Sequence, residues 1–297
     1  MKPIFIFLIL IFLIQTAYPQ PGTTGLSFLK TGISPRAIAM GDVYPIEKAD
    51  PAAVYYNSAF LSLTNQTQVV FVHREWIKDT RTEFLGFSTM LDNFRFAFGV
   101  NSTSIIDIEQ RTIPGDPEGT FTSRNAALSF TTAYLLNNLN FGISGKYLYE
   151  KILIDEASGY AFDLGLLYKD LYGFNLGFSV SNLGSMNKLR NESSTLPVIS
   201  RFGVSRIIDF ENFDALIIPA ADFVTITNEK KSHLHLGIEM TYKNTVSIRT
   251  GIRTGYEASF FTAGVGARYS ILAFDYAFAP FMYELGPTHS FSISIIL

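Results

Sequence analysis

Two histidines and a glutamate on one strand face are the residues best placed for chemistry. His233, His235 and Glu239 alternate with apolar residues, so their side chains would point to the same side of an extended segment. Imidazole and carboxylate groups are common ligands of transition metals. The chain has no cysteine and offers no further histidine nearby, so the ligand set is incomplete and we predict no metal site.

A hydrolytic enzyme would need a nucleophile or an activated water with histidine and carboxylate partners. The two remaining histidines, His73 and His289, lie near opposite ends of the strand-forming region. They would become neighbours if the first and last strands of a closed barrel paired, but no motif supports a catalytic role. Phosphate-binding and dinucleotide-binding motifs are also absent from the sequence. We therefore predict no catalytic residues and no cofactor.

The hairpin that carries His233 and Glu239 sets the pattern for most of the chain. Polar and apolar residues alternate on both sides of the turn Lys243-Asn244, and this period of two predicts an antiparallel pair of strands. Fourteen such segments follow one another to the C-terminus. They cover approximately residues 67–74, 81–91, 94–106, 123–136, 139–152, 157–169, 173–183, 198–208, 213–226, 232–242, 245–254, 258–268, 270–279 and 288–297.

The connections between these segments alternate in length. Those after even-numbered segments are short, such as 92–93 and 137–138, whereas those after odd-numbered segments are mostly longer, notably 107–122, 184–197 and 280–287. Short turns at one end and long loops at the other are typical of outer-membrane barrels. We predict an all-β protein, a transmembrane antiparallel β-barrel of about 14 strands over residues 67–297, with 12 to 16 strands open.

Composition agrees with a membrane protein. The chain is 47% hydrophobic and 14% aromatic, but only 16% of its residues are charged, against roughly 25% in ordinary globular domains. A net charge of -3 argues against nucleic acid as a partner, because such proteins present a basic surface. The partner that the composition predicts is outer-membrane lipid.

The first 20 residues have the features of a secretory signal peptide. Lys2 precedes an uninterrupted apolar run from Ile4 to Ile14, which is shorter than the about 20 apolar residues that span a bilayer. An N-terminal membrane anchor is the alternative. With the barrel pattern, a signal peptide over residues 1–20 predicts the outer membrane of a Gram-negative bacterium.

If the apolar strand faces meet lipid, the opposite faces line the lumen. Charges of both signs then point inward and can pair across a narrow barrel, which favours an occluded lumen over a wide aqueous channel. The predicted lumen charges include Arg95, Asp163, Arg201, Glu239, Arg249, Arg253, Arg268 and Asp275.

Residues 21–66 have no period-two pattern and are rich in Ala, Gly and Pro. Many small residues would let this segment fit inside the barrel, and Asn57 can cap a short helix that begins at Ser58. We predict an N-terminal plug segment; the alternative is an exposed periplasmic tail.

Two motifs in this segment, at residues 34–42 and 48–61, carry a family resemblance. They follow the pattern R-A-x-A-M-G and then D-x-x-A-x-x-x-N-x-A-x-L, to which Arg36, Met40, Gly41, Asp50 and Asn57 contribute. The pattern resembles that of the PorV/PorQ family of outer-membrane proteins, whose fold is similar to that of the FadL-type channels. The resemblance implies a non-enzymatic part in type IX protein secretion or in cargo attachment at the cell surface, with secreted cargo proteins and other type IX secretion components as partners. The competing hypothesis is a FadL-like channel for hydrophobic small molecules, because one fold can serve both functions.

Overall fold

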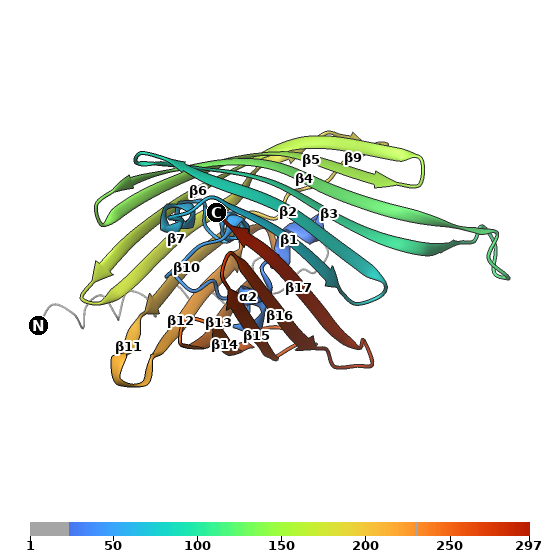
Figure 1. Ribbon diagram of the computed structural model, residues 1–297. Coiled ribbons are helices and arrows are strands. Elements are labelled where there is room, and N and C mark those ends of the chain that lie inside the picture. The colour runs from blue at the N-terminus through green and yellow to red at the C-terminus, as the bar shows by residue number, and fades with distance from the viewer. Residues whose placement is uncertain (1–23, 230) are drawn as a thin grey trace, which may run out of the picture.

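The computed structural model describes residues 24–229 and 231–297, so the predicted signal peptide lies outside the described residues. Fourteen antiparallel strands close into a barrel (Figure 1). Strands β1 to β7 are neighbours in chain order, β7 pairs with β10 and β10 with β12, and the closing pair is β17 with β1. This confirms the predicted barrel. The strands are β1 (Gln68–Glu75), β2 (Thr80–Leu91), β3 (Phe94–Gln110), β4 (Gly119–Leu136), β5 (Leu139–Ile152), β6 (Asp155–Leu171), β7 (Phe174–Met186), β10 (Ile199–Arg206), β12 (Ala215–Ile226), β13 (Lys231–Tyr242), β14 (Val246–Arg253), β15 (Phe261–Tyr269), β16 (Leu272–Pro280) and β17 (Pro287–Ile296).

Three short strands complete the sheet assignment. β11 (Ile208–Phe210) extends the hairpin with β12, and β8 (Lys188–Leu189) pairs with β9 (Glu192–Ser193) in a separate small hairpin. We call the end of the barrel with the short connections the short-turn end, and the other the loop end.

The bounds predicted for β5 are those observed, but the predicted bounds of its neighbours were too narrow. β3 continues to Gln110 and β4 begins at Gly119, so their hairpin runs well past the predicted ends at 106 and 123. Figure 1 shows this extension projecting beyond the shorter strands β14 to β17. Polar residues dominate it, and a strand with water on both faces needs no apolar alternation. The sequence pattern therefore stops where the apolar surface stops.

The predicted loop 184–197 also differs from the structure. β7 continues to Met186, the β8–β9 hairpin follows, and Leu196 is buried. This connection packs against the N-terminal segment, because Gly25 donates its backbone N–H to the carbonyl oxygen of Thr195 at 3.0 Å. It is therefore part of the packed structure and not a free loop.

The outer surface of the barrel is an apolar belt. Phe178 and Ile238 are 47% and 43% exposed, and large apolar side chains from all fourteen strands share this surface. Soluble monomers rarely expose contiguous apolar patches of more than a few hundred Å². The belt indicates that the strands cross a membrane. No helix among the described residues is long and apolar enough to do so.

A charge in this belt should be costly. We expect Ile238→Arg to lower the free energy of unfolding in liposomes by roughly 2 to 4 kcal/mol, as an arginine near the midplane does in other barrels. Denaturant titration of the refolded protein measures it. The matched control is Asn138→Arg, because Asn138 is exposed in a short turn and its φ is not positive. Equal stability of the two variants would contradict the assignment of the belt to lipid.

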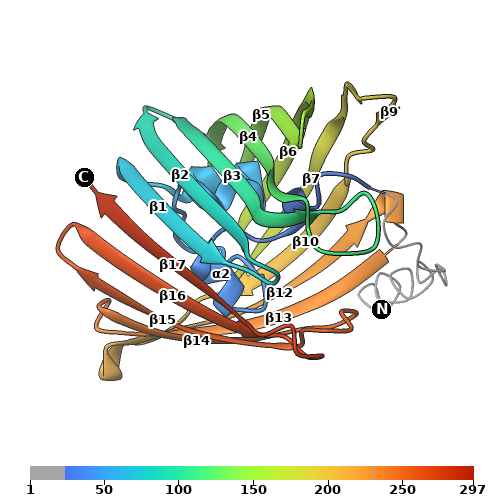
Figure 2. The ribbon, with the colours of Figure 1, turned by 90° about the vertical axis from the view of Figure 1, so that its right-hand side faces the viewer.

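The N-terminal segment (residues 24–66) lies inside the barrel, where Figure 2 shows it crossing the lumen between the two walls. It forms η1 (Ser27–Lys30), α2 (Pro35–Ala39), η2 (Pro51–Tyr55) and η3 (Ser58–Leu63). Gly25 contacts the loop end, whereas Thr67, just after the segment, accepts a hydrogen bond from the backbone N–H of Leu297 at the short-turn end. The segment thus spans the length of the lumen.

Two of these four short helices have a side-chain cap at the start, and a third begins with proline. Pro35 occupies the first turn of α2, where its missing N–H is not needed. The side chain of Asp50 accepts the N–H of Ala52 at 2.7 Å at the start of η2. Asn57 does the same for the N–H of Ala59 at 2.9 Å at the start of η3.

Candidate functional site

Arg36 lies in a line of alternating charges that ties the N-terminal segment to the wall. Its Nε and Nη2 donate to the two carboxylate oxygens of Glu239 on β13 at 2.8 and 2.6 Å. Glu239 also accepts from Arg249 Nε on β14 at 2.5 Å, and Arg249 Nη1 donates to Asp275 on β16 at 2.6 Å. Burial alone would lower the pKa of Arg36, but Glu239 raises it well above its ordinary value. The bidentate pair is therefore a charged and directional anchor.

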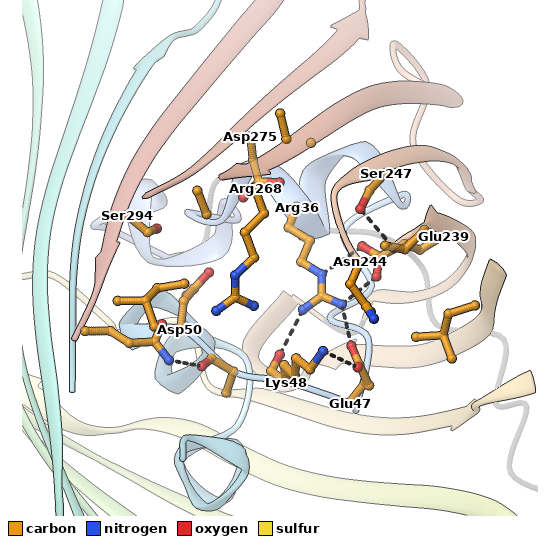
Figure 3. A pocket seen from close by; sticks show the side chains of 18 of the residues that line it. Arg36, Glu47, Lys48, Asp50, Glu239, Asn244, Ser247, Arg268, Asp275 and Ser294 are labelled. Carbon is orange, nitrogen blue, oxygen red and sulfur yellow. Dashed lines mark hydrogen bonds and ion pairs between the residues drawn. The ribbon is translucent and has the colours of Figure 1, made fainter. Parts of the chain in front are cut away.

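A cavity of about 200 Å³ opens beside this line of charges at the short-turn end. Figure 3 shows the side chains of Arg36 and Arg268 within it. Arg268 Nη2 lies 3.5 Å from Gln66 Oε1, and Lys48 Nζ lies 3.2 Å from a carboxylate oxygen of Glu47. Pockets for hydrophobic ligands are mostly apolar with a few polar groups. Many charged and polar side chains line this cavity, so it differs from such pockets.

Asp50 lines the same cavity, and its protonation should affect how the stability of the protein depends on pH. Burial raises the pKa of Asp50 to about 6, above the ordinary value of about 3.9. The folded state therefore prefers the protonated form. Its contribution to stability is fully present below the ordinary pKa and is lost as the pH rises through 6.

We expect Asp50→Asn to flatten the dependence of stability on pH between about 4 and 6, by less than the about 1.4 kcal/mol per pH unit that a difference of one bound proton gives. The amide oxygen of Asn can still cap η2. Melting in detergent across this pH range measures the effect. Asp116→Asn, in an exposed loop, is the control, and equal pH profiles of Asp50→Asn and the parent protein would contradict it.

Strand glycines let the segment touch both walls. A β-carbon on Gly142 or Gly165 would collide with the backbone of Ala59, and one on Gly251 would collide with Met40. Asn57 uses this closeness, because its Nδ2 donates to the carbonyl oxygens of Leu166 and Phe178 at 3.1 Å each. Glycine at these positions is needed for the close approach of two backbones.

Two tyrosines of the segment are each held by a cation from the wall. Lys146 Nζ on β5 lies 5.2 Å from the ring centre of Tyr55, and the guanidinium of Arg201 on β10 lies 5.1 Å from that of Tyr56. Arg201 Nη1 also donates to Asp222 at 2.7 Å. Such cation–π contacts are stronger where water is excluded, so they add to the fixing of the segment in mid-lumen.

An apolar recess occupies the lumen nearer the loop end. Leu26 and Phe28 of the N-terminal segment fill it, and both are buried. Its wall is formed by side chains of β4, β5, β6, β7 and the connection after β7, namely Ala127, Leu148, Ala157, Ala161, Met186 and Leu196. Lys30 of the same segment pairs with Glu229 at 2.6 Å. Leu26 and Phe28 thus form one apolar cluster with the wall, and we call the part of the wall that they contact the apolar recess.

The structure places the predicted residues of the segment at its contacts with the wall. Arg36 binds Glu239, Asp50 and Asn57 cap two helices, and Met40 and Gly41 lie against β13 to β15. Gly41 has a positive φ of 74° and donates its N–H to Thr262.

The predicted lumen charges lie on inward faces but do not form one site. Glu239, Arg249 and Asp275 join Arg36, whereas the others are spread over the wall. Arg95 donates to the carbonyl oxygen of Thr64 at 2.7 Å. The remaining partners are Lys146 for Asp163, Asp222 for Arg201, Ser259 for Arg253 and Gln66 for Arg268.

The histidines do not meet Glu239. His233 stacks on Tyr256 with 4.0 Å between ring centres, and His235 Nε2 lies 3.1 Å from the hydroxyl of Tyr256. Within residues 24–229 and 231–297, no three His, Cys, Asp or Glu side chains are grouped to hold a metal ion.

The other two histidines lie on the outer face of adjacent strands, as barrel closure requires. His289 on β17 is opposite Glu75 on β1, and His73 is two residues before Glu75. His289 Nδ1 lies 2.9 Å from the hydroxyl of Tyr276. Their neighbours are thus a carboxylate and a phenol on the outside of the barrel.

The sequence reasoning missed the apolar recess and the glycine contacts. Leu26 and Phe28 were not singled out, because no periodicity marks them. The glycine contacts could have been predicted, because Gly142 and Gly165 are directly opposite each other in the register of β5 and β6. Facing glycines at inward positions indicate that another backbone approaches there.

Known structures of the same fold include two hydrocarbon transporters. The toluene transporter TodX of Pseudomonas putida matches with a TM-score of 0.62 and 13% identity over 89% of this chain and 96% of that chain. The toluene transporter TbuX of Ralstonia pickettii matches with a TM-score of 0.58 and 14% identity over 89% and 97%. A FadL homologue of Pseudomonas aeruginosa matches with a TM-score of 0.48 and 12% identity over 93% and 98%. At such identities the likeness to TodX and TbuX shows the fold alone.

A scan against protein-family models finds no match, and neither does a search of curated proteins. The likeness to transporter barrels does not single out the PorV/PorQ family. That resemblance rests on the motifs of the N-terminal segment.

Proposed function

We propose that this protein is an outer-membrane channel for hydrophobic small molecules, closed at rest by its N-terminal segment. The observation that carries the proposal is the apolar recess filled by Leu26 and Phe28. A site that accepts a leucine and a phenylalanine side chain has the size and polarity for an apolar molecule of similar size, which would displace them. The shared fold with the toluene transporters TodX and TbuX supports the same reading.

Uptake by whole cells tests the proposal. Gram-negative host cells that produce the protein should take up radiolabelled toluene with a several-fold higher initial rate than cells without it. Leu148→Ser makes the recess wall polar, and we expect it to remove most of this gain. Leu167→Ser is the matched control, because Leu167 is equally buried but lies in a different apolar cluster. Uptake unaffected by the protein, or equally affected by both variants, would contradict the channel.

A second candidate function is the type IX secretion adaptor that the PorV/PorQ resemblance implies. The structural observation in its favour is the polar β3–β4 extension, which would project beyond the outer leaflet as a surface for cargo. Shortening the tip at residues 111–118 would leave the barrel folded and would abolish co-purification of a secreted partner if this reading holds. Unchanged partners together with toluene uptake would favour the channel.

A further inference from the structure

A small polar cavity borders the apolar recess. Its volume is about 20 Å³, which is room for about one water molecule. Phe28 lines both the cavity and the recess. Lys146, which also lines the cavity, is directly opposite Ala161 of the recess wall in the register of β5 and β6. A molecule that took the place of Phe28 in the recess would therefore reach this cavity with one end.

The charged side chains that line the small cavity already have counter-charges. The pairs are Lys146 with Asp163 at 2.5 Å, Arg201 with Asp222 at 2.7 Å, Lys30 with Glu229 at 2.6 Å, and Asp42 with Arg201 at 3.8 Å. A bound anion would have to compete with these carboxylates for the same cations. A carboxylate group is also larger than the one water molecule for which there is room. The cavity therefore suits a small polar group without charge.

Two side chains of the barrel wall can hydrogen-bond to such a group. Ser181 is buried on an inward face of β7 and lines the cavity, and its hydroxyl makes no hydrogen bond to another described residue. An ammonium group has three N–H donors, and Lys146 Nζ uses two of them, for Asp163 and for Asn182 at 3.0 Å. A hydroxyl group both accepts and donates, so Lys146 and Ser181 can bind one hydroxyl together.

We propose that the channel binds apolar molecules that carry one hydroxyl group, such as alkylphenols, in preference to the corresponding carboxylates. The apolar body takes the place of Leu26 and Phe28 in the recess, and the hydroxyl enters the small cavity between Lys146 and Ser181. A hydrocarbon in the same place makes neither hydrogen bond, and buried polar groups without partners are costly. The inference rests on the proposed channel function and adds the class of molecule that the recess accepts.

Calorimetric titration of the purified protein in detergent at pH 7 tests the hydroxyl site. The probes are 4-methylphenol, toluene and 4-methylbenzoate, which share an apolar body and differ in the group that enters the cavity. Ser181→Ala should lower the preference for 4-methylphenol over toluene by about 2- to 10-fold, as the loss of one hydrogen bond does. Partition of the probes into detergent is the same for every variant, so it does not affect this comparison. 4-Methylbenzoate should bind more weakly than 4-methylphenol.

Ser88→Ala is the matched control. Ser88 is fully buried, its hydroxyl has no hydrogen-bond partner among the described residues, and it does not line the small cavity. We expect this variant to keep the preference of the parent protein. In crystals soaked with 4-bromophenol, the bromine should give an anomalous peak in the recess beside Leu148, with the phenol oxygen within hydrogen-bond distance of Ser181.

The possible results distinguish the hydroxyl site from the channel itself. If toluene and 4-methylphenol bind with a preference that Ser181→Ala leaves unchanged, the hydroxyl site is wrong and the channel stands. Tighter binding of 4-methylbenzoate than of 4-methylphenol, or bromine at the outer surface alone, would likewise overturn the hydroxyl site. If none of the three probes binds, both proposals are wrong.

Discussion

Removal of residues 24–63 opens the barrel, and planar-bilayer recordings of the shortened protein will show large, stable conductance where the intact protein shows little. The segment spans the lumen and is anchored to both walls by Arg36 and Asn57. Without it, the inward glycines and paired charges would face a water-filled interior wide enough for ions.

A point variant provides the control for the deletion. Gly165→Leu places a side chain where Ala59 and Asn57 now touch β6, so it should displace the segment and give intermittent openings. Gly119→Leu, in an open position without neighbours, should leave the recordings unchanged. Stable openings in the intact protein would show that the segment does not close the lumen.

Glu239→Ala should lower the free energy of unfolding by about 3–5 kcal/mol, because it removes the buried carboxylate that Arg36 and Arg249 share. Denaturant titration measures the loss. Glu47→Ala is the control: Glu47 makes one 3.3 Å contact with Arg36, and Arg36 keeps its two bonds to Glu239 without it, so its loss should cost about 1 kcal/mol or less.

A double variant tests whether Arg36 and Glu239 stabilise the protein as a pair. In Glu239→Ala with Arg36→Ala, one of the stranded cations is gone, so the total loss should be smaller than the sum of the two single losses. A strictly additive result, or a loss from Glu239→Ala no greater than that from Glu47→Ala, would show that the line of charges does not hold the segment.

The barrel could be predicted from the sequence because lipid on one side of each strand imposes a period of two. Phe178 and Ile238 illustrate this, since their neighbours in sequence point inward and are polar or glycine. The same reasoning failed where the lipid ends. In the β3–β4 extension both faces meet water, so no pattern marked residues 107–110 or 119–122 as strand.

The partners of the lumen residues could not be predicted in the same way. Alternation assigns Glu239 to the inside, but it does not say that Arg36, some 203 residues away, will bind it. The apolar recess was hidden because Leu26 and Phe28 come from a segment without periodicity. Motif resemblance indicated PorV/PorQ, whereas the fold is shared with toluene transporters. A shared fold does not decide between the two functions.

The path of the N-terminal segment also constrains how the chain assembles. Its anchors join residues made first to strands made last, and the contact of Arg36 with Glu239 encloses most of the chain in one loop. Closing so long a loop is slow and entropically costly. The contacts of η3 with β5 to β7 close shorter loops than the contact of Arg36 with β13, so they can form earlier in folding. Contacts with the N-terminal segment can then fix the register of β13 to β16, and a barrel without the segment should close more slowly.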